Sequence, residues 1–362
     1  MKRILTLDGG GIRGVFSLQI LAKIEKLLQE EKKNPDLRLS QVFDLIAGTS
    51  TGAIIAAFLS WGMRVSEVEE LYCTRGKDMF AREPWYRRWK AKYRSEAIAN
   101  YFREVFSEEQ EDGTKAPATL GSKNLKTLLL VIMRNATTGS PWPVSNNKDA
   151  MFNDPTLPDC NLNIPLWQLL RGSTAAPSYF PPEEIDLAGK KFLFIDGGMT
   201  PFNNPALIAM LMATLPPYNI NWQATRESLH VTSIGTGFVR ASLPLKHAAE
   251  INMLDQIKYL APAFIGSVSV EQDVLCRILG DCLHGPPIDI ELGSLVAPTL
   301  LSRAEQKFTY VRYDEPFVLT GEDLKLKLSM EMDNLDLIPY LKKAGEAYAA
   351  KHVSLEHFRP RP

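Results

Sequence analysis

Residues 43–58 constrain the fold of this chain most strongly. They place a serine, flanked by two glycines, between an apolar run typical of a strand and an apolar run typical of a helix. An apolar run ends in residues 48–52, Gly-Thr-Ser-Thr-Gly, and an Ala-rich run of helical composition follows at once. The pattern predicts a strand, a sharp turn at Ser50 and a helix. The alternative is a loop that merely starts a helix. The strand-turn-helix context favours a nucleophile elbow, in which the helix N-terminus stabilises negative charge that develops near the serine.

A second glycine-rich segment, residues 8–14, reads Asp-Gly-Gly-Gly-Ile-Arg-Gly. It lies between a predicted buried strand at residues 3–7 and a predicted amphipathic helix at residues 15–29. Its glycines match the G-x-G-x-x-G pattern of dinucleotide sites, but the next predicted strand leads to Ser50 instead of ending in an acidic residue for a ribose. Free N–H groups in such a loop can also hold an oxyanion, and Arg13 would add positive charge. We favour the oxyanion role. Dinucleotide or phosphate binding by this loop, without hydrolase activity, remains the alternative.

Asp196 follows an apolar stretch at residues 191–195 and precedes two glycines. A carboxylate at the end of a strand lies at the edge where open α/β sheets place their sites, although Asp-Gly is also a strong hairpin signal. A triad of the α/β-hydrolase type would need a histidine after the aspartate in the chain. None of the five histidines has the expected loop-after-strand setting, and we expect structural or solvated roles for His230, His247, His284, His352 and His357. A Ser50–Asp196 dyad is chemically sufficient if the site also stabilises an oxyanion.

Composition narrows the class of protein. The chain has 362 residues, of which 45% are hydrophobic and 23% are charged, which predicts one large or two moderate globular domains. A net charge of -1 gives no overall electrostatic case for nucleic acid, so no DNA partner is expected. The four scattered cysteines predict reduced thiols in a cytosolic protein and no metal site. No apolar stretch approaches the ~20 residues of a spanning helix, so membrane contact would be peripheral.

The segment from Arg82 to Arg94 is locally basic and interleaved with tryptophan and tyrosine. Such a composition suits an interfacial membrane anchor. It equally suits a nucleotide site, in which aromatic faces stack on bases and arginines bind phosphates. A solvated helix face whose tryptophans belong to the core is the third interpretation, and all three stay open.

In this order and context, the motifs at residues 8–14, 48–52 and 196–198 resemble those of the patatin-like phospholipases. Residues 173–180 and 203–205 also look like segments of that family, so the resemblance covers roughly the first two thirds of the chain. It implies a patatin-like three-layer α/β/α sandwich, hydrolysis of fatty-acyl esters of membrane phospholipids or lysophospholipids, and no cofactor or metal. It also implies a dyad of Ser50 and Asp196, with an oxyanion hole formed by Gly9, Gly10, Gly11 and Arg13.

The last third of the chain predicts helices at residues 252–260, 270–283 and 336–350 and a strand at residues 308–313. We therefore expect a hydrolase domain at residues 1–240 and a mostly helical, regulatory extension at residues 241–362. Residues 282–289 and 310–313 resemble the bacterial patatin-like effectors of cyclic-oligonucleotide anti-phage signalling, of the CapV type. This resemblance implies activation by a cyclic di- or trinucleotide, a ligand-dependent homo-oligomer, and a cytoplasmic protein that contacts the inner face of the membrane when active.

Overall fold

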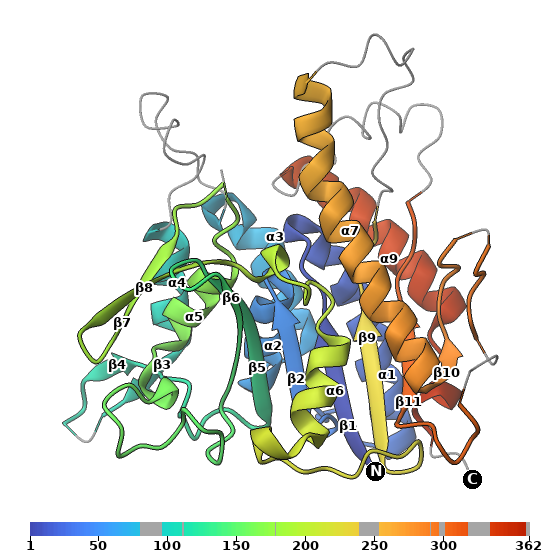
Figure 1. Cartoon of the computed structure of the whole chain (residues 1–362), viewed down its shortest axis with the longest axis horizontal. Helices are drawn as coiled ribbons and strands as arrows, with labels where there is room; N and C mark the ends of the chain where they lie inside the picture. The colour runs from blue at the N-terminus through green and yellow to red at the C-terminus, as the bar shows by residue number, and fades with distance from the viewer. Residues whose placement is uncertain are drawn as a thin grey trace.

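A mostly parallel sheet with helices on both faces forms the centre of the molecule (Figure 1). The computed structural model describes residues 1–79, 96–110, 112–177, 179–238, 253–289, 291–296, 301–317 and 334–359. Among these residues nine strands form one sheet, and β3 (Ser107–Glu109) and β4 (Lys115–Pro117) form a separate antiparallel pair. The order across the large sheet is β10 (Asp281–His284), β11 (Thr309–Tyr313), β9 (Leu229–Ile234), β1 (Lys2–Leu7), β2 (Leu45–Thr49), β5 (Leu128–Asn135), β8 (Lys190–Asp196) and β7 (Glu183–Leu187), while β6 (Ser140–Ser145) pairs with β5.

The strands from β10 to β5 run parallel, and their carboxyl ends meet at one edge of the sheet. β2, β9 and β11 are buried along their whole length, which is typical of parallel strands that helices cover on both faces. In the register, Leu7 pairs with Gly48 and Thr49 pairs with Ile132. The segments that follow β1 and β2, which contain Asp8 and Ser50, therefore emerge side by side.

Alternate residues of the central strands face two separate hydrophobic cores, as the two-residue period of a strand requires. Leu5 and Leu7 pack into the first core, and Ile4 packs into the second. The first core is covered by α1 (Gly14–Lys32), α2 (Thr51–Ser60), α3 (Val65–Met79), α4 (Glu96–Val105), α5 (Leu166–Ser173) and α9 (Ile338–His352). The second is covered by α6 (Ala206–Thr214) and α7 (Met253–Leu279), which lie in front of the sheet in Figure 1. This arrangement confirms the predicted three-layer α/β/α sandwich.

Short 3-10 helices connect these elements in several places. Two of them belong to the candidate site, namely η1 (Gly11–Arg13) and η5 (Gly197–Met199). The others within the described ranges are η2 (Leu39–Gln41), η4 (Asn161–Asn163), η6 (Pro216–Tyr218), η8 (Leu335–Leu337) and η9 (Leu355–Phe358).

The last third of the chain contributes to both the sheet and its helical layers. β11 pairs with β9, α7 packs on the sheet beside α6, and α9 packs along α1. The predicted helices at residues 252–260 and 270–283 form one helix, α7, which continues through Pro262. The end of the second predicted helix is wrong, because residues 281–284 form the strand β10. The division into two domains at residue 240 stays a prediction. The sheet contains strands from both sides of that residue. The segment from Arg82 to Arg94 lies outside the described residues.

Candidate active site

Ser50 occupies the sharp turn between β2 and α2. Its backbone has φ 53° and ψ -123°, a conformation that is costly for a residue with a side chain and that is found mainly at functional sites. A Cβ on Gly48 would collide with the carbonyl of Gly52, and a Cβ on Gly52 would collide with the carbonyl of Leu7. The two glycines are therefore required by close backbone approach. The geometry is that of the predicted elbow, with the serine at the N-terminus of α2.

The hydroxyl of Ser50 donates a hydrogen bond of 2.7 Å to Oδ2 of Asp196. The other carboxylate oxygen accepts from the N–H of Gly198, also at 2.7 Å. Both interpretations of the Asp-Gly pair apply, because Asp196 ends β8 and also caps the short helix η5. β8 runs antiparallel to β5 and pairs with its last three residues, which places Asp196 opposite Met133. The carboxylate therefore reaches the carboxyl edge of the parallel strands from the opposite direction.

The carboxyl group of Asp196 is a stronger base than an ordinary aspartate. Burial raises its pKa to about 6, while the hydrogen bonds from Ser50 and Gly198 act in the opposite direction. The group is still mostly ionised at neutral pH. A base whose pKa lies near the working pH is well suited to remove a proton from a hydroxyl.

Ser173, at the end of α5, is a site residue that the sequence did not identify. Its side chain is completely buried, and its hydroxyl accepts the N–H of Ser50 at 2.9 Å. The same hydroxyl donates to the carbonyl of Ile132 at 2.7 Å. It thus joins the elbow to the neighbouring strand β5. Its position in the segment of residues 173–180 was the only sequence signal, and that signal did not name its partners.

The glycine loop presents its N–H groups to one side, because its carbonyls are held from the other. The hydroxyl of Thr236 donates to the carbonyl of Gly9 at 3.3 Å, and Arg13 donates to the carbonyl of Gly10 from both its backbone N–H and Nε at 3.3 Å. In a trans peptide the carbonyl and the following N–H point in opposite directions. The N–H groups of Gly10 and Gly11 therefore point away from Thr236 and Arg13. In the part of the chain that the structure describes, neither donates a hydrogen bond.

The four residues predicted for an oxyanion hole differ in what their groups contact. Gly9 lies against Ser50, but its N–H donates to the carbonyl of Asn203 at 3.2 Å. Gly10 and Gly11 keep their N–H groups available. Arg13 is half-buried, and burial lowers the pKa of its guanidinium, while Asp314 and Asp8 act to raise it. Arg13 supports the loop through the carbonyl of Gly10.

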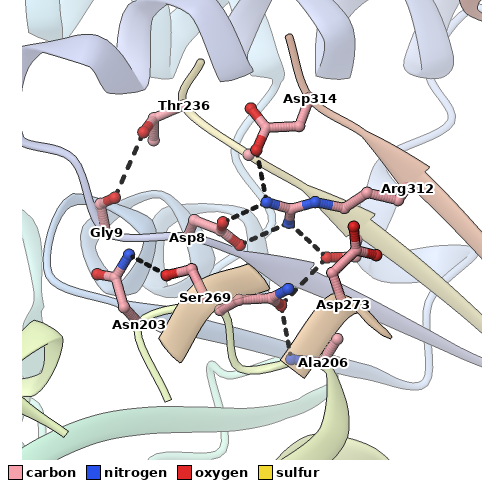
Figure 2. Close-up of polar contacts among 12 residues, drawn as sticks. Asp8, Gly9, Asn203, Ala206, Thr236, Ser269, Asp273, Arg312 and Asp314 are labelled. Carbon is pink, nitrogen blue, oxygen red and sulfur yellow. Dashed lines mark hydrogen bonds and ion pairs between the residues drawn. The ribbon is translucent and has the colours of Figure 1, made fainter. Parts of the chain in front are cut away.

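Asp8 begins the glycine loop, and its side chain binds a residue from the far end of the sequence. The guanidinium of Arg312, on β11, contacts both carboxylate oxygens of Asp8, at 2.9 and 2.6 Å (Figure 2). Figure 2 also shows Asn203 donating to Ser269 on α7, at 3.2 Å. Neither contact could be predicted, because no local pattern connects residues that are 304 or 66 positions apart.

The described histidines have structural surroundings. His230 is fully buried in β9, where burial and the neighbouring Arg3 and His357 lower its pKa to about 3. His284 packs against His352 and His357, with ring centroids 5.4 and 5.3 Å apart. His247 lies outside the described residues. Within the described ranges, no group of three or more His, Cys, Asp or Glu side chains is arranged to hold a metal ion.

Comparisons with known proteins place the chain among the patatin-like phospholipases. The family model of the patatin-like phospholipases matches residues 5–210. A cGAMP-activated phospholipase from Escherichia coli is 30% identical over 239 residues, which cover 65% of this chain and 62% of that protein. A second cGAMP-activated phospholipase, from Vibrio cholerae, is 29% identical over 222 residues, which cover 58% of this chain and 56% of that protein. Patatin-like protein 4 from Arabidopsis thaliana is 30% identical over 222 residues, covering 57% and 51%.

The chain therefore spans less than two thirds of the length of each of these relatives. The family match covers more than half of the chain and includes the glycine loop, the elbow and Asp196. The chain belongs to the patatin-like phospholipase family.

Proposed function

We propose that the protein is a serine acyl hydrolase that cleaves fatty-acyl esters of membrane phospholipids or lysophospholipids. The observation that carries the proposal is the 2.7 Å hydrogen bond from the Ser50 hydroxyl to Asp196, made by a serine with strained backbone at a helix N-terminus. Family membership supports the same reaction class. A separate hydrogen bond holds each of the two residues in place. The backbone N–H of Ser50 donates to the hydroxyl of Ser173, and the carboxylate of Asp196 accepts the N–H of Gly198.

The reaction follows from these positions. Oγ of Ser50 attacks the ester carbonyl carbon while Oδ2 of Asp196 takes the hydroxyl proton. The tetrahedral intermediate collapses to an acyl-serine, and Asp196 returns the proton to the departing alkoxide. A water molecule then attacks the acyl group, Asp196 accepts its proton, and the fatty acid leaves as Ser50 recovers the proton.

We assign the oxyanion hole to the N–H groups of Gly10 and Gly11. Their carbonyl partners are engaged on the opposite side of the loop, which fixes the direction of both N–H groups before substrate arrives. Preorganised donors of this kind stabilise an oxyanion strongly because they need no rearrangement during the reaction. The dinucleotide alternative is less well supported, because the loop packs against a serine that is bound to a carboxylate.

The test is hydrolysis of a soluble short-chain ester and of phospholipid vesicles, together with labelling by a fluorophosphonate. Ser50→Ala is expected to lose all three activities, and Asp196→Asn to lose on the order of 10⁴-fold in turnover. Asp186→Asn is the matched control, because Asp186 also accepts a glycine N–H in a turn, at 2.7 Å from Gly189, but is not part of the site. Turnover by Asp196→Asn close to that of this control would refute the dyad.

The proposal extends to control by a cyclic dinucleotide or trinucleotide, as part of anti-phage defence. Its support is the pair of relatives named cGAMP-activated phospholipases, together with the harm that an unrestrained membrane lipase would cause. A ligand that prefers the active state shifts the population towards it, and a homo-oligomer is one form that this state can take. Hydrolysis and sedimentation are therefore measured with and without a panel of cyclic di- and trinucleotides. Full activity of the ligand-free monomer would contradict this part of the proposal.

The first half of α7 supports peripheral contact with the membrane that carries the substrate. Met253, Leu260 and Phe264 are 74%, 62% and 67% exposed, and their spacing places them on one face of the helix. Figure 1 shows this half of α7 projecting beyond the sheet at the edge to which β2 and β9 point.

Among the described residues, no helix has the length and apolar character needed to span a bilayer. We place the protein in the cytoplasm, at the inner face of the membrane when active, which fractionation of infected cells would test.

A further inference from the structure

Arg312 is a buried arginine that lies outside the residues matched by the family model, yet it contacts the first residue of the glycine loop. Besides the two bonds to Asp8, Nη2 binds Asp314 at 2.6 Å (Figure 2). Nη1 also donates to the hydroxyl of Ser233 at 2.8 Å. The side chain of Arg312 is only 4% exposed, so these direct contacts are shielded from solvent. One guanidinium therefore joins three segments at the carboxyl edge of β1, β9 and β11.

Each of the three residues that Arg312 contacts is connected to Gly9, either by a peptide bond or by hydrogen bonds. The first is covalent, since Asp8 precedes Gly9. In the second, Asp314 accepts the N–H of Gly237 at 2.9 Å, and the adjacent Thr236 holds the carbonyl of Gly9.

In the third route, the hydroxyl of Ser233 donates to Asn204 at 3.3 Å, and the carbonyl of the adjacent Asn203 accepts the N–H of Gly9. Arg312 thus contacts Asp8, the residue before Gly9. It also contacts Ser233 and Asp314, and these two residues connect through Asn204–Asn203 and Gly237–Thr236 to the N–H and the carbonyl of Gly9. The Gly9 carbonyl shares a peptide plane with the Gly10 N–H, so its position also sets the direction of that N–H.

Charge makes Arg312 difficult to replace. Asp8 and Asp314 are both buried, and Arg312 forms an ion pair with each of them. Without it two buried carboxylates would repel each other, which is strongly unfavourable. Lysine would keep the charge, but its single ammonium lacks the planar fork that binds both oxygens of Asp8 and reaches Asp314.

We propose that Arg312 is a positioning residue of the glycine loop, and that it fixes the direction of the Gly10 N–H group. The role as part of an oxyanion hole rests on the proposed function; the ordering of the loop does not. The last third of the chain thereby takes part in the geometry of the site.

The experiment compares Arg312→Lys with Arg277→Lys. Arg277 is an equally buried arginine that binds Asp273 through two nitrogens, at 3.0 and 2.5 Å, but does not contact the glycine loop. Three quantities are measured for each variant: kcat and KM on a soluble ester, affinity for a trifluoromethyl ketone that forms an anionic tetrahedral adduct, and hydrogen exchange over residues 8–14. Thermal unfolding reports the stability of both.

Arg312→Lys is expected to lower kcat by about 10²-fold with KM nearly unchanged, because only the transition state carries the oxyanion. Affinity for the ketone should fall in parallel, and exchange in the loop should accelerate by about 10-fold or more. Arg277→Lys should lose stability without these effects. Asp314→Asn, which keeps the pair of Arg312 with Asp8, provides a milder variant if Arg312→Lys does not fold, and its kcat should fall by about 10-fold.

Equal behaviour of the Arg312 and Arg277 variants in kcat, ketone affinity and loop exchange would overturn the proposal. If the wild-type protein hydrolyses no ester either with or without the panel of cyclic di- and trinucleotides, the proposed function fails, and loop exchange alone then decides the role of Arg312. Unchanged exchange in Arg312→Lys would show that the loop is ordered without it.

Discussion

Replacing Ser173 by alanine should both destabilise the protein and impair the elbow. The substitution removes the hydroxyl that accepts the Ser50 N–H and donates to the Ile132 carbonyl, and it leaves both backbone groups without these partners in a buried position. Each buried group that loses its partner costs about 1–3 kcal/mol. Because the alanine also removes a hydroxyl that folding had to desolvate, we expect a net loss of about 2–4 kcal/mol in the free energy of unfolding.

This loss converts into a measurable shift in Tm. An unfolding entropy of about 2.1 cal/mol/K per residue gives about 0.8 kcal/mol/K for 362 residues that unfold together, so Tm should fall by about 3–5 °C. The strained backbone of Ser50 also loses one of its restraints, and misplacement of a nucleophile by about 1 Å can cost 10²-fold in rate. We expect kcat on a soluble ester to fall by about 10- to 100-fold.

Thr174→Val is the matched control, because it removes a hydroxyl from the next residue of the same chain segment. That hydroxyl donates at 2.8 Å to the carbonyl of Leu170, which also accepts the N–H of Thr174 and so keeps a partner. Calorimetry and ester hydrolysis are run on both variants. If Ser173→Ala melts and turns over like Thr174→Val, the bridge between the elbow and β5 has no energetic importance and the reasoning fails.

Three further changes test other parts of the site. The kcat/KM of a soluble ester should fall as the pH drops below about 6, because protonation of Asp196 removes the base. Burial also raises the pKa of Asp8 to about 6, so the same fall in kcat/KM must persist in Asp8→Asn. If the fall disappears in that variant, the titrating group is Asp8 and not Asp196. Gly10→Ala should lower kcat by about 10²-fold, since its Cβ would collide with Thr236; an unchanged kcat would exclude Gly10 from the oxyanion hole. Phe264→Asp should weaken binding to anionic vesicles while soluble ester hydrolysis persists, and equal vesicle binding would remove α7 from the membrane contact.

The predictable parts of this protein are those with a local cause. Gly48 and Gly52 fix the elbow because any Cβ there would meet backbone, and this requirement is visible as a five-residue pattern. The strands β1 and β2 are visible in the sequence as apolar runs that each lead into a glycine-containing turn. The order of the three motifs was then enough to identify the family.

The parts that could not be predicted depend on pairing across the chain. Asp196 was expected at the end of a strand, but the antiparallel direction of β8 depends on its hairpin with β7 and its short overlap with β5. Ser173 and Arg312 look ordinary in the sequence, because their importance comes from partners that other segments supply. β10 was hidden within a helical pattern, since its four residues are too few to show a period of their own.

The placement of β11 beside β9 has a practical meaning for protein engineering. Exchanging the end of the chain at residue 240 for that of another family member would separate β9 from its neighbour β11 and Asp8 from Arg312. A crossover beyond Phe317 would keep the strand, Arg312 and Asp314 with the sheet to which they belong. Chimeras between family members are therefore better joined after β11 than at residue 240.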